Sequence, residues 1–288
     1  MHWILLVVSM ILTPGGMTSP LTPAGEKPPV VTMSVDSGQT IMARGDTNFL
    51  LCTLRIPDGY HIYWSNPGAS GTATEIEITA PAGYEIDPMR WPRPEVFNEP
   101  EGTTYGYTDR VTFVIPFRGA VQFPEPCEFL VSARWLACKK VCFMGSASSR
   151  IEVSLVDHVA VEPSVAMREA ESLIPVPISE RPSTRVTFAG DRMVISGPTD
   201  PAGAPGFIPG HVSGVVLGEP TVRADDARFE MVIPVDLEPE NALGAVRAVH
   251  GLLIFGMNPQ DPSYTIRMPI LRPTPPDSGP GGSDGGED

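Results

Sequence analysis

Cys138 and Cys142, which enclose only three residues, are the positions at which residue type and spacing in this sequence indicate chemistry. The segments 129–135 and 150–155 on either side are rich in β-forming residues and partly alternate between apolar and polar, so we expect two strands joined by a tight loop. Across such a loop the Cα atoms of the two cysteines should lie about 5–6 Å apart, a separation that suits a disulfide.

A disulfide at this position predicts reactivity more than stability. The closed ring is very small, so the bond removes little entropy from the unfolded chain. Lys139 and Lys140 favour thiolate over thiol, and a lower pKa makes a sulfur easier to attack and a better leaving group. We therefore interpret the pair as a redox-active dithiol. Two alternatives stay open, a passive surface disulfide and a soft-metal site in which Met144 would assist the thiolates in binding Cu(I).

Composition places these cysteines in an all-β protein. The chain has 288 residues, of which 42% are hydrophobic, 33 are proline and 28 are glycine. This length is enough for two small domains, and the many turn-forming residues favour β-sandwiches. The formal net charge is −14 and basic residues are not clustered, which argues against nucleic acid or an anionic membrane surface as a partner.

Both ends of the chain have a composition unlike that of a folded domain. The apolar run at residues 3–12 is too short to span a bilayer and is typical of a secretory signal, so we expect residues 1–24 to be a signal peptide. Export to the periplasm or the exterior would permit disulfides. No later run is long enough to cross a membrane, and the acidic, Pro/Gly-rich tail 273–288 is expected to be disordered.

Between these ends the pattern predicts two β-sandwich domains joined by a short helical linker. The first covers residues 30–157, with strands expected at 30–35, 48–56, 75–79 and 105–115, and with an aromatic strand that runs into a loop within 60–71. The prolines in 90–97 predict a surface loop that carries Trp91 and Phe97. The linker, 158–183, contains a helix expected at 163–173 with Ser164 as its N-cap. The second domain covers residues 184–272, with strands expected at 185–188, 193–196, 212–217, 228–235, 249–255 and 264–270.

Motifs spread over the first domain carry a family resemblance. In order they are Tyr63-Trp64-x-Asn66-Pro67-Gly68-x-Ser70-Gly71, Trp91-Pro92, Tyr107-x-Asp109-Arg110 and Trp135-Leu136-x-Cys138-x-x-x-Cys142. This order resembles the N-terminal periplasmic domain of the DsbD thiol:disulfide interchange family, and most of all the subgroup found in suppressor-of-copper-sensitivity membrane reductases. The second β domain weakly resembles the one that accompanies the first in that subgroup.

The resemblance implies that the sandwiches are immunoglobulin-like, and it implies a relay of electrons from a membrane-embedded reductase to oxidised, thioredoxin-like periplasmic proteins. It implies that Cys138 and Cys142 exchange, that Cys142 forms the mixed disulfide, and that the loop with Trp91 and Phe97 shields the pair. We also expect Trp135, Lys139 and Lys140 to cover or support the pair. Better-known members separate their cysteines by a longer loop. Because no later segment of this sequence could span a bilayer, we expect the reductase to be a separate polypeptide.

The remaining cysteines and the histidines point to no further chemistry. Cys52 and Cys127 are either buried thiols or a structural disulfide that would stabilise the fold by on the order of 4 kcal/mol. The five histidines are scattered, and none lies beside the cysteines in sequence. We therefore expect no metal and no cofactor, and we expect His61 to be a packed residue at a strand end.

Overall fold

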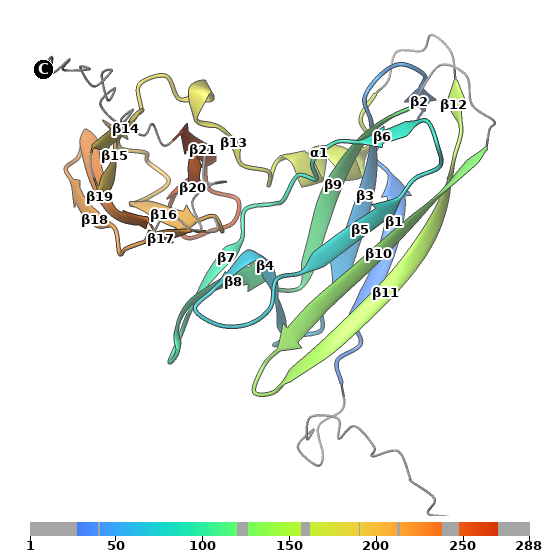
Figure 1. Ribbon diagram of the computed structural model, residues 1–288, viewed down its shortest axis with the longest axis horizontal. Helices are drawn as coiled ribbons and strands as arrows, with labels where there is room; N and C mark the ends of the chain where they lie inside the picture. The colour runs from blue at the N-terminus through green and yellow to red at the C-terminus, as the bar shows by residue number, and fades with distance from the viewer. Residues whose placement is uncertain are drawn as a thin grey trace, which may run out of the picture.

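A computed structural model describes residues 28–39, 41–119, 126–156, 162–189, 191–211, 214–237 and 248–269. The signal peptide expected at 1–24 and the tail expected at 273–288 lie outside these residues. The described chain folds into two β units with a short helical segment between them (Figure 1).

The first unit packs two antiparallel sheets face to face. One has the order β1-β3-β9-β6, with bounds Thr32–Ser37, Asn48–Arg55, Arg110–Gly119 and Tyr84–Ile86. The other has the order β11-β10-β4-β8-β7, with bounds Cys142–Val153, Cys127–Cys138, His61–Gly68, Gly102–Tyr107 and Glu95–Glu99, and β5 (Glu75–Thr79) also pairs with β10. Two short strands, β2 (Met42–Ala43) and β12 (Leu155–Val156), pair in parallel.

The second unit is also made of two sheets. One has the order β13-β21-β20-β16, with bounds Val176–Pro177, Ser263–Pro269, Ala248–Phe255 and Pro205–Pro209. The other has the order β14-β15-β19-β17, with bounds Arg185–Ala189, Arg192–Pro198, Arg228–Leu237 and Val215–Leu217, and β18 (Thr221–Ala224) also pairs with β19. A 3-10 helix, η1 (Ile178–Glu180), precedes β14.

Alternating strands explain the two cores. Along β10 every second residue from Phe129 to Ala137 faces inward and is at most 5% exposed, while the residues between them are more accessible. Phe113, Phe117 and Phe129 fill the first core, and Met193, Met231 and Phe255 are completely buried in the second. The expected fold class, two immunoglobulin-like β-sandwiches with a short helix between them, is confirmed.

The helix α1 (Val165–Glu171) begins as expected, because the side chain of Ser164 accepts a hydrogen bond from the Met167 N–H at 3.1 Å. The short, polar sequence of this helix favours a connector more than a core element, but the structure gives it a packing role as well. Met167 is 1% exposed and Ala170 is 3% exposed, and both pack on Leu51 and Val114 of the first sandwich. The apolar face of α1 therefore belongs to the first unit.

The strand expected at 105–115 is interrupted. β8 ends at Tyr107 and β9 begins at Arg110, because Asp109 adopts a positive φ of 51° and its carbonyl accepts a hydrogen bond from the Ile56 N–H. The break moves the chain from one sheet of the sandwich to the other. The region 90–97 is irregular up to Pro94 and then forms the edge strand β7, where the preceding prolines cost no ladder hydrogen bonds.

Candidate functional site

The longest hairpin of the molecule positions the two cysteines. β10 and β11 pair residue by residue from Cys127 with Val153 to Cys138 with Cys142, which leaves a three-residue loop, as expected. The hairpin is longer than predicted, because residues 142–149 also form strand. Its loop lies at one end of the first sandwich (Figure 1).

Cys138 and Cys142 form a disulfide. Their Cα atoms are 4.1 Å apart, which is less than the 5–6 Å we expected and closer to the separation of a non-hydrogen-bonded antiparallel pair. The two cysteines differ in accessibility, since Cys138 is 3% exposed whereas Cys142 is exposed. A thiolate from another protein can therefore reach the sulfur of Cys142 more readily than that of Cys138.

His61 is a titratable residue paired with Cys138 in the sheet, and the sequence did not reveal this pairing. β4 pairs with the last two residues of β10, so that His61 stands directly opposite Cys138 on the side away from Cys142. Directly opposite side chains have Cβ atoms about 4.5–5.5 Å apart and share a face. His61, Cys138 and Cys142 therefore form one row across three strands.

The imidazole of His61 is enclosed by two aromatic rings and a carboxylate. The ring of Phe97 stacks on it at 4.9 Å between centroids, and the ring of Tyr63 meets it edge-on at 5.0 Å. Glu99 lies 3.8 Å from its Nε2 atom, which is buried and has no hydrogen-bond acceptor among the described residues. Burial lowers the pKa of His61, and the negative charges of Glu99 and Glu95 oppose this effect.

The aromatic residues expected to cover the pair take different positions. Phe97 lies in β7 and reaches the row through His61. Trp91 instead packs edge-on against Phe113 at 4.9 Å and lines a cleft between the two units. Trp135 faces the core, and its indole occupies the space where a side chain on Gly145 would lie. Of the three, Phe97 is the one whose ring stacks on a residue of the row, His61.

Both lysines of the loop are exposed. The ammonium of Lys139 lies 5.6 Å from the centroid of the Tyr60 ring and against Gly59, whose φ of 77° requires glycine. Lys139 thus contacts the turn between β3 and β4. The effect of Lys139 and Lys140 on the thiolates of Cys138 and Cys142 stays a prediction.

Cys52 and Cys127 are not joined by a disulfide. In the sheet, Cys52 pairs with Phe113 of β9. The Cys127 sulfur lies 2.9 Å from the hydroxyl oxygen of Tyr84, and the residue Tyr84 pairs with Gly119 at the end of β9. Six strand residues span about 20 Å, and a disulfide needs Cα atoms within about 7 Å. Burial raises the pKa of the Cys52 thiol to about 12, so this thiol is unreactive at neutral pH.

No group of three or more His, Cys, Asp or Glu side chains in the described residues is arranged to hold a metal ion. No helix in the described part of the chain is long and apolar enough to cross a membrane.

The first unit is an immunoglobulin-like sandwich with a disulfide across one hairpin end, and comparison with known proteins shows which family this sandwich matches. Residues 32–152 match the family "Thiol:disulfide interchange protein DsbD, N-terminal". The match covers the first sandwich of this chain, where the sequence motifs indicated the same family. No curated protein sequence matches the chain.

Among solved structures, the chain is similar to the N-terminal periplasmic domain of ScsB from Proteus mirabilis. The two share 18% identity with a TM-score of 0.57, over 82% of this chain and 91% of that one. Since the match covers most of both chains, it shows that the fold is shared across both sandwiches. The E. coli chaperone DraB matches at 12% identity with a TM-score of 0.21, too low to define a common fold.

Proposed function

We propose that this protein exchanges thiols and disulfides through Cys138 and Cys142, and passes electrons between a membrane thiol reductase and thioredoxin-like partners. The observation that carries the proposal is the disulfide at the hairpin end, with Cys142 exposed and Cys138 buried. The family of the first sandwich, which is named for thiol:disulfide interchange, supports it. So does the periplasmic origin of the similar ScsB domain, which agrees with export of this chain.

The exchange takes place in two steps. A thiolate of the reduced partner attacks the sulfur of Cys142, a mixed disulfide forms, and Cys138 leaves with the bond's electron pair as a thiolate and takes up a proton. The second thiol of the partner then attacks the partner's sulfur in the mixed disulfide, and Cys142 leaves and is protonated. Two electrons and two protons have moved to the pair, and the reverse steps reduce the next disulfide.

His61 has a part in this proposal. A thiolate at the buried position of Cys138 is costly unless a nearby group stabilises or protonates it. The imidazole of His61 lies opposite Cys138 in the sheet and is stacked on by Phe97, which supports a role in exchanging a proton with the Cys138 sulfur. Phe97 would then act by positioning His61, a more specific role than shielding the pair.

The test begins with the wild-type disulfide. Equilibration in glutathione buffers, followed by alkylation and mass spectrometry, should give a reduction potential above about −300 mV, because a structural disulfide lies below that value. In the second step, Cys138→Ser and Cys142→Ser variants react with oxidised glutathione. The exposed Cys142 should form its adduct at least about tenfold faster than the buried Cys138.

The Cys138→Ser/Cys142→Ser double variant reports any reaction of Cys52 and Cys127 and serves as the blank. A potential below about −300 mV together with equal adduct rates for the two single variants would sink the proposal.

Copper loading is a second candidate, favoured by one observation. Met144 is 73% exposed and lies two residues from Cys142 on the same face of β11, so the reduced pair and this thioether present three soft ligands together. Native mass spectrometry of the reduced protein with one equivalent of Cu(I) tests it. Retention of copper by the wild type and its loss in Met144→Leu would favour this function.

A further inference from the structure

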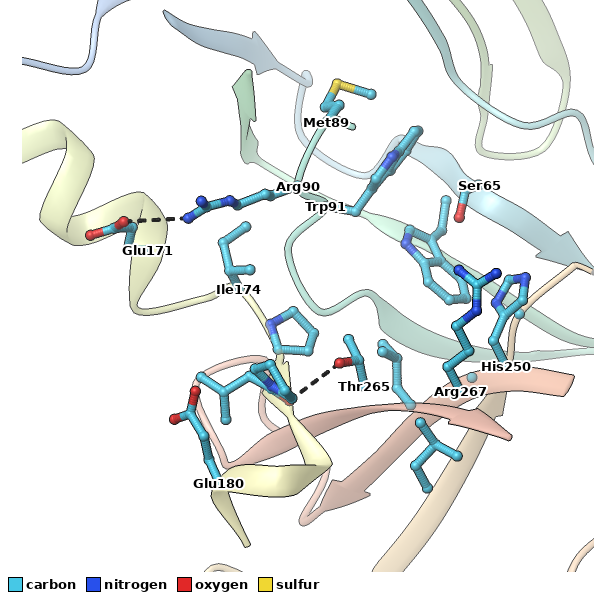
Figure 2. Close-up of a pocket in the computed structure, with 18 residues that line it drawn as sticks. Ser65, Met89, Arg90, Trp91, Glu171, Ile174, Glu180, His250, Thr265 and Arg267 are labelled. Atoms are coloured by element: carbon cyan, nitrogen blue, oxygen red, sulfur yellow. Dashed lines mark hydrogen bonds and ion pairs between the residues drawn. The ribbon is translucent and has the colours of Figure 1, made fainter. Parts of the chain in front are cut away.

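A cleft of about 890 Å³ lies where the two sandwiches and the connector meet (Figure 2). The first sandwich contributes Trp64 and the segment 89–91, the connector contributes 174–177, and the second sandwich contributes parts of β20 and β21. Its lining includes no cysteine, so it is separate from the disulfide site. Both its volume and its place between domains are typical of small-molecule sites.

Two tryptophans make one wall of the cleft apolar and rigid. Trp64 is 6% exposed and packs edge-on against Tyr105, while Trp91 packs edge-on against Phe113. The indole N–H of Trp64 is buried and has no acceptor among the described residues. Buried donors are normally satisfied, and leaving one without a partner costs about 1–3 kcal/mol. Aromatic walls with one unsatisfied donor suit a planar apolar molecule that also carries an acceptor.

The opposite wall carries a cationic arginine beside a histidine. His250 and Arg267 stand directly opposite each other on β20 and β21 and lie side by side at one end of the cleft (Figure 2). Partial burial and then the positive charge of Arg267 lower the pKa of His250. Gly210 lies beneath this imidazole, where any side chain would collide with the ring.

Arg267 differs from Arg90, the other arginine of the cleft lining. Arg90 has a carboxylate of Glu171 at 3.7 Å, and Figure 2 places that ion pair at the far end. No carboxylate of the described residues forms an ion pair with Arg267 or His250. In a chain of net charge −14, a cationic arginine without an anionic partner among the described residues favours an anion supplied from outside.

We propose that the cleft binds a small organic carboxylate with an aromatic body. The carboxylate is held by Arg267, whose planar guanidinium suits two-point binding, and by His250. The aromatic body lies against Trp64 and Trp91. Because the walls come from both sandwiches and the connector, the bound molecule also holds them together.

The probe is 4-phenylbutyrate, titrated into the full chain at neutral pH while tryptophan fluorescence is followed. Two of the chain's 4 tryptophans line the cleft, so occupancy should change the signal saturably. A ligand of this size should bind one site with a Kd of about 1 mM or tighter. The neutral analogue 4-phenylbutanol should bind at least about tenfold more weakly, because it lacks the charge.

Variants locate the site. Arg267→Gln should weaken 4-phenylbutyrate binding about tenfold, and His250→Gln should weaken it severalfold. Arg185→Gln, which removes an exposed arginine of β14 outside the cleft lining, should leave binding unchanged. The Cys138→Ser/Cys142→Ser variant should bind like the wild type, which separates this result from the fate of the redox proposal. Thermal melting checks that each variant is folded.

The inference is overturned by equal affinity for the acid and the alcohol, or by a signal that stays linear to about ten times the expected Kd. Binding that survives in both folded variants, Arg267→Gln and His250→Gln, would overturn it as well.

Discussion

At the scale of single residues, the row of His61, Cys138 and Cys142 joins a titratable group to the disulfide. Burial is the main cause of the lowered pKa of His61, with the charges of Glu99 and Glu95 acting in the opposite direction. In the unfolded chain its pKa returns to about 6.5. The folded state therefore binds the proton less tightly, and this contribution to stability is complete above about pH 6.5 and is lost as the pH falls below it.

We accordingly predict that the free energy of unfolding falls between about pH 7.5 and about pH 5, and that His61→Phe makes this fall smaller. Urea unfolding at several pH values measures both slopes. The pKa of His250 is lowered too, so His61→Phe alone should leave part of the dependence and the His61→Phe/His250→Phe variant should remove more. Identical slopes for the wild type and His61→Phe would contradict this account.

The sequence predicted one part of this row and missed the other for a physical reason. Cys138 and Cys142 are neighbours in the chain, so a loop of three residues was enough to predict their bond. His61 comes beside them only because β4 pairs with the end of β10, a long-range register that local patterns do not encode. For the same reason the sequence left a disulfide between Cys52 and Cys127 open. The places where their neighbours lie along β9 became known only with the pairing of the strands.

At the scale of elements, the β10–β11 hairpin depends on a close approach between Trp135 and Gly145. The two residues pair across the strands, and a Cβ atom on Gly145 would overlap the indole ring. We predict that Gly145→Ala destabilises the protein by about 1–3 kcal/mol, the usual cost of overpacking. Ser146→Ala, at the next, exposed position of the same strand, is the control and should change stability by less than about 0.5 kcal/mol.

Chemical denaturation measures this prediction, and the disulfide should still be formed in both variants. If Gly145→Ala is as stable as the wild type, the indole moves readily and does not fix the hairpin. The sequence missed the first half of β11 because its glycine and serines disfavour strand when judged locally. Pairing with the strongly β-forming β10 overrides that preference.

The helix α1 provides a second test at this scale, because it was expected to be a connector and is packed on the first core. We predict that Met167→Ala costs about 2–5 kcal/mol, as expected for a fully buried methionine. Val165→Ala in the same helix is the control, since Val165 is 64% exposed and should contribute less than about 0.5 kcal/mol. Equal effects in urea denaturation would mean that the helix is only loosely attached.

At the scale of the whole molecule, Arg93 links the first sandwich to the second. It is 2% exposed, and its guanidinium donates hydrogen bonds to the carbonyls of Phe255 (3.3 Å), Gly256 (2.7 Å) and Asp261 (3.0 Å) in the second unit. Its backbone N–H donates to the carbonyl of Leu173 in the connector at 2.8 Å. The sequence placed Arg93 in a proline-rich loop but gave no sign of these partners, because carbonyl acceptors carry no sequence signature.

The relative placement of the sandwiches should therefore depend on this side chain. The Arg93→Met variant keeps an unbranched apolar stem but removes the donors. We predict that it destabilises the contact between the two units by about 1.5–3 kcal/mol or more, because hydrogen bonds to a charged group are lost and carbonyls are left unsatisfied. The connector at residues 173–183 should then be cut severalfold faster by a protease, since local opening becomes more frequent. Mass spectrometry of the fragments identifies the cut.

Arg110→Met is the matched control. The guanidinium of Arg110, in β9, is partly exposed and lies 3.7 Å from the carboxylate of Glu169 in α1. Its loss should therefore cost less than about 1 kcal/mol and leave cleavage of the connector unchanged. Reduction of the Cys138–Cys142 disulfide should also be unaffected in Arg93→Met, because the hairpin lies in the first sandwich and does not depend on the contact. If the connector of Arg93→Met is cut at the wild-type rate, the apolar residues Ile208, Leu252 and Ile254, which pack against the first core, are sufficient to hold the two units together.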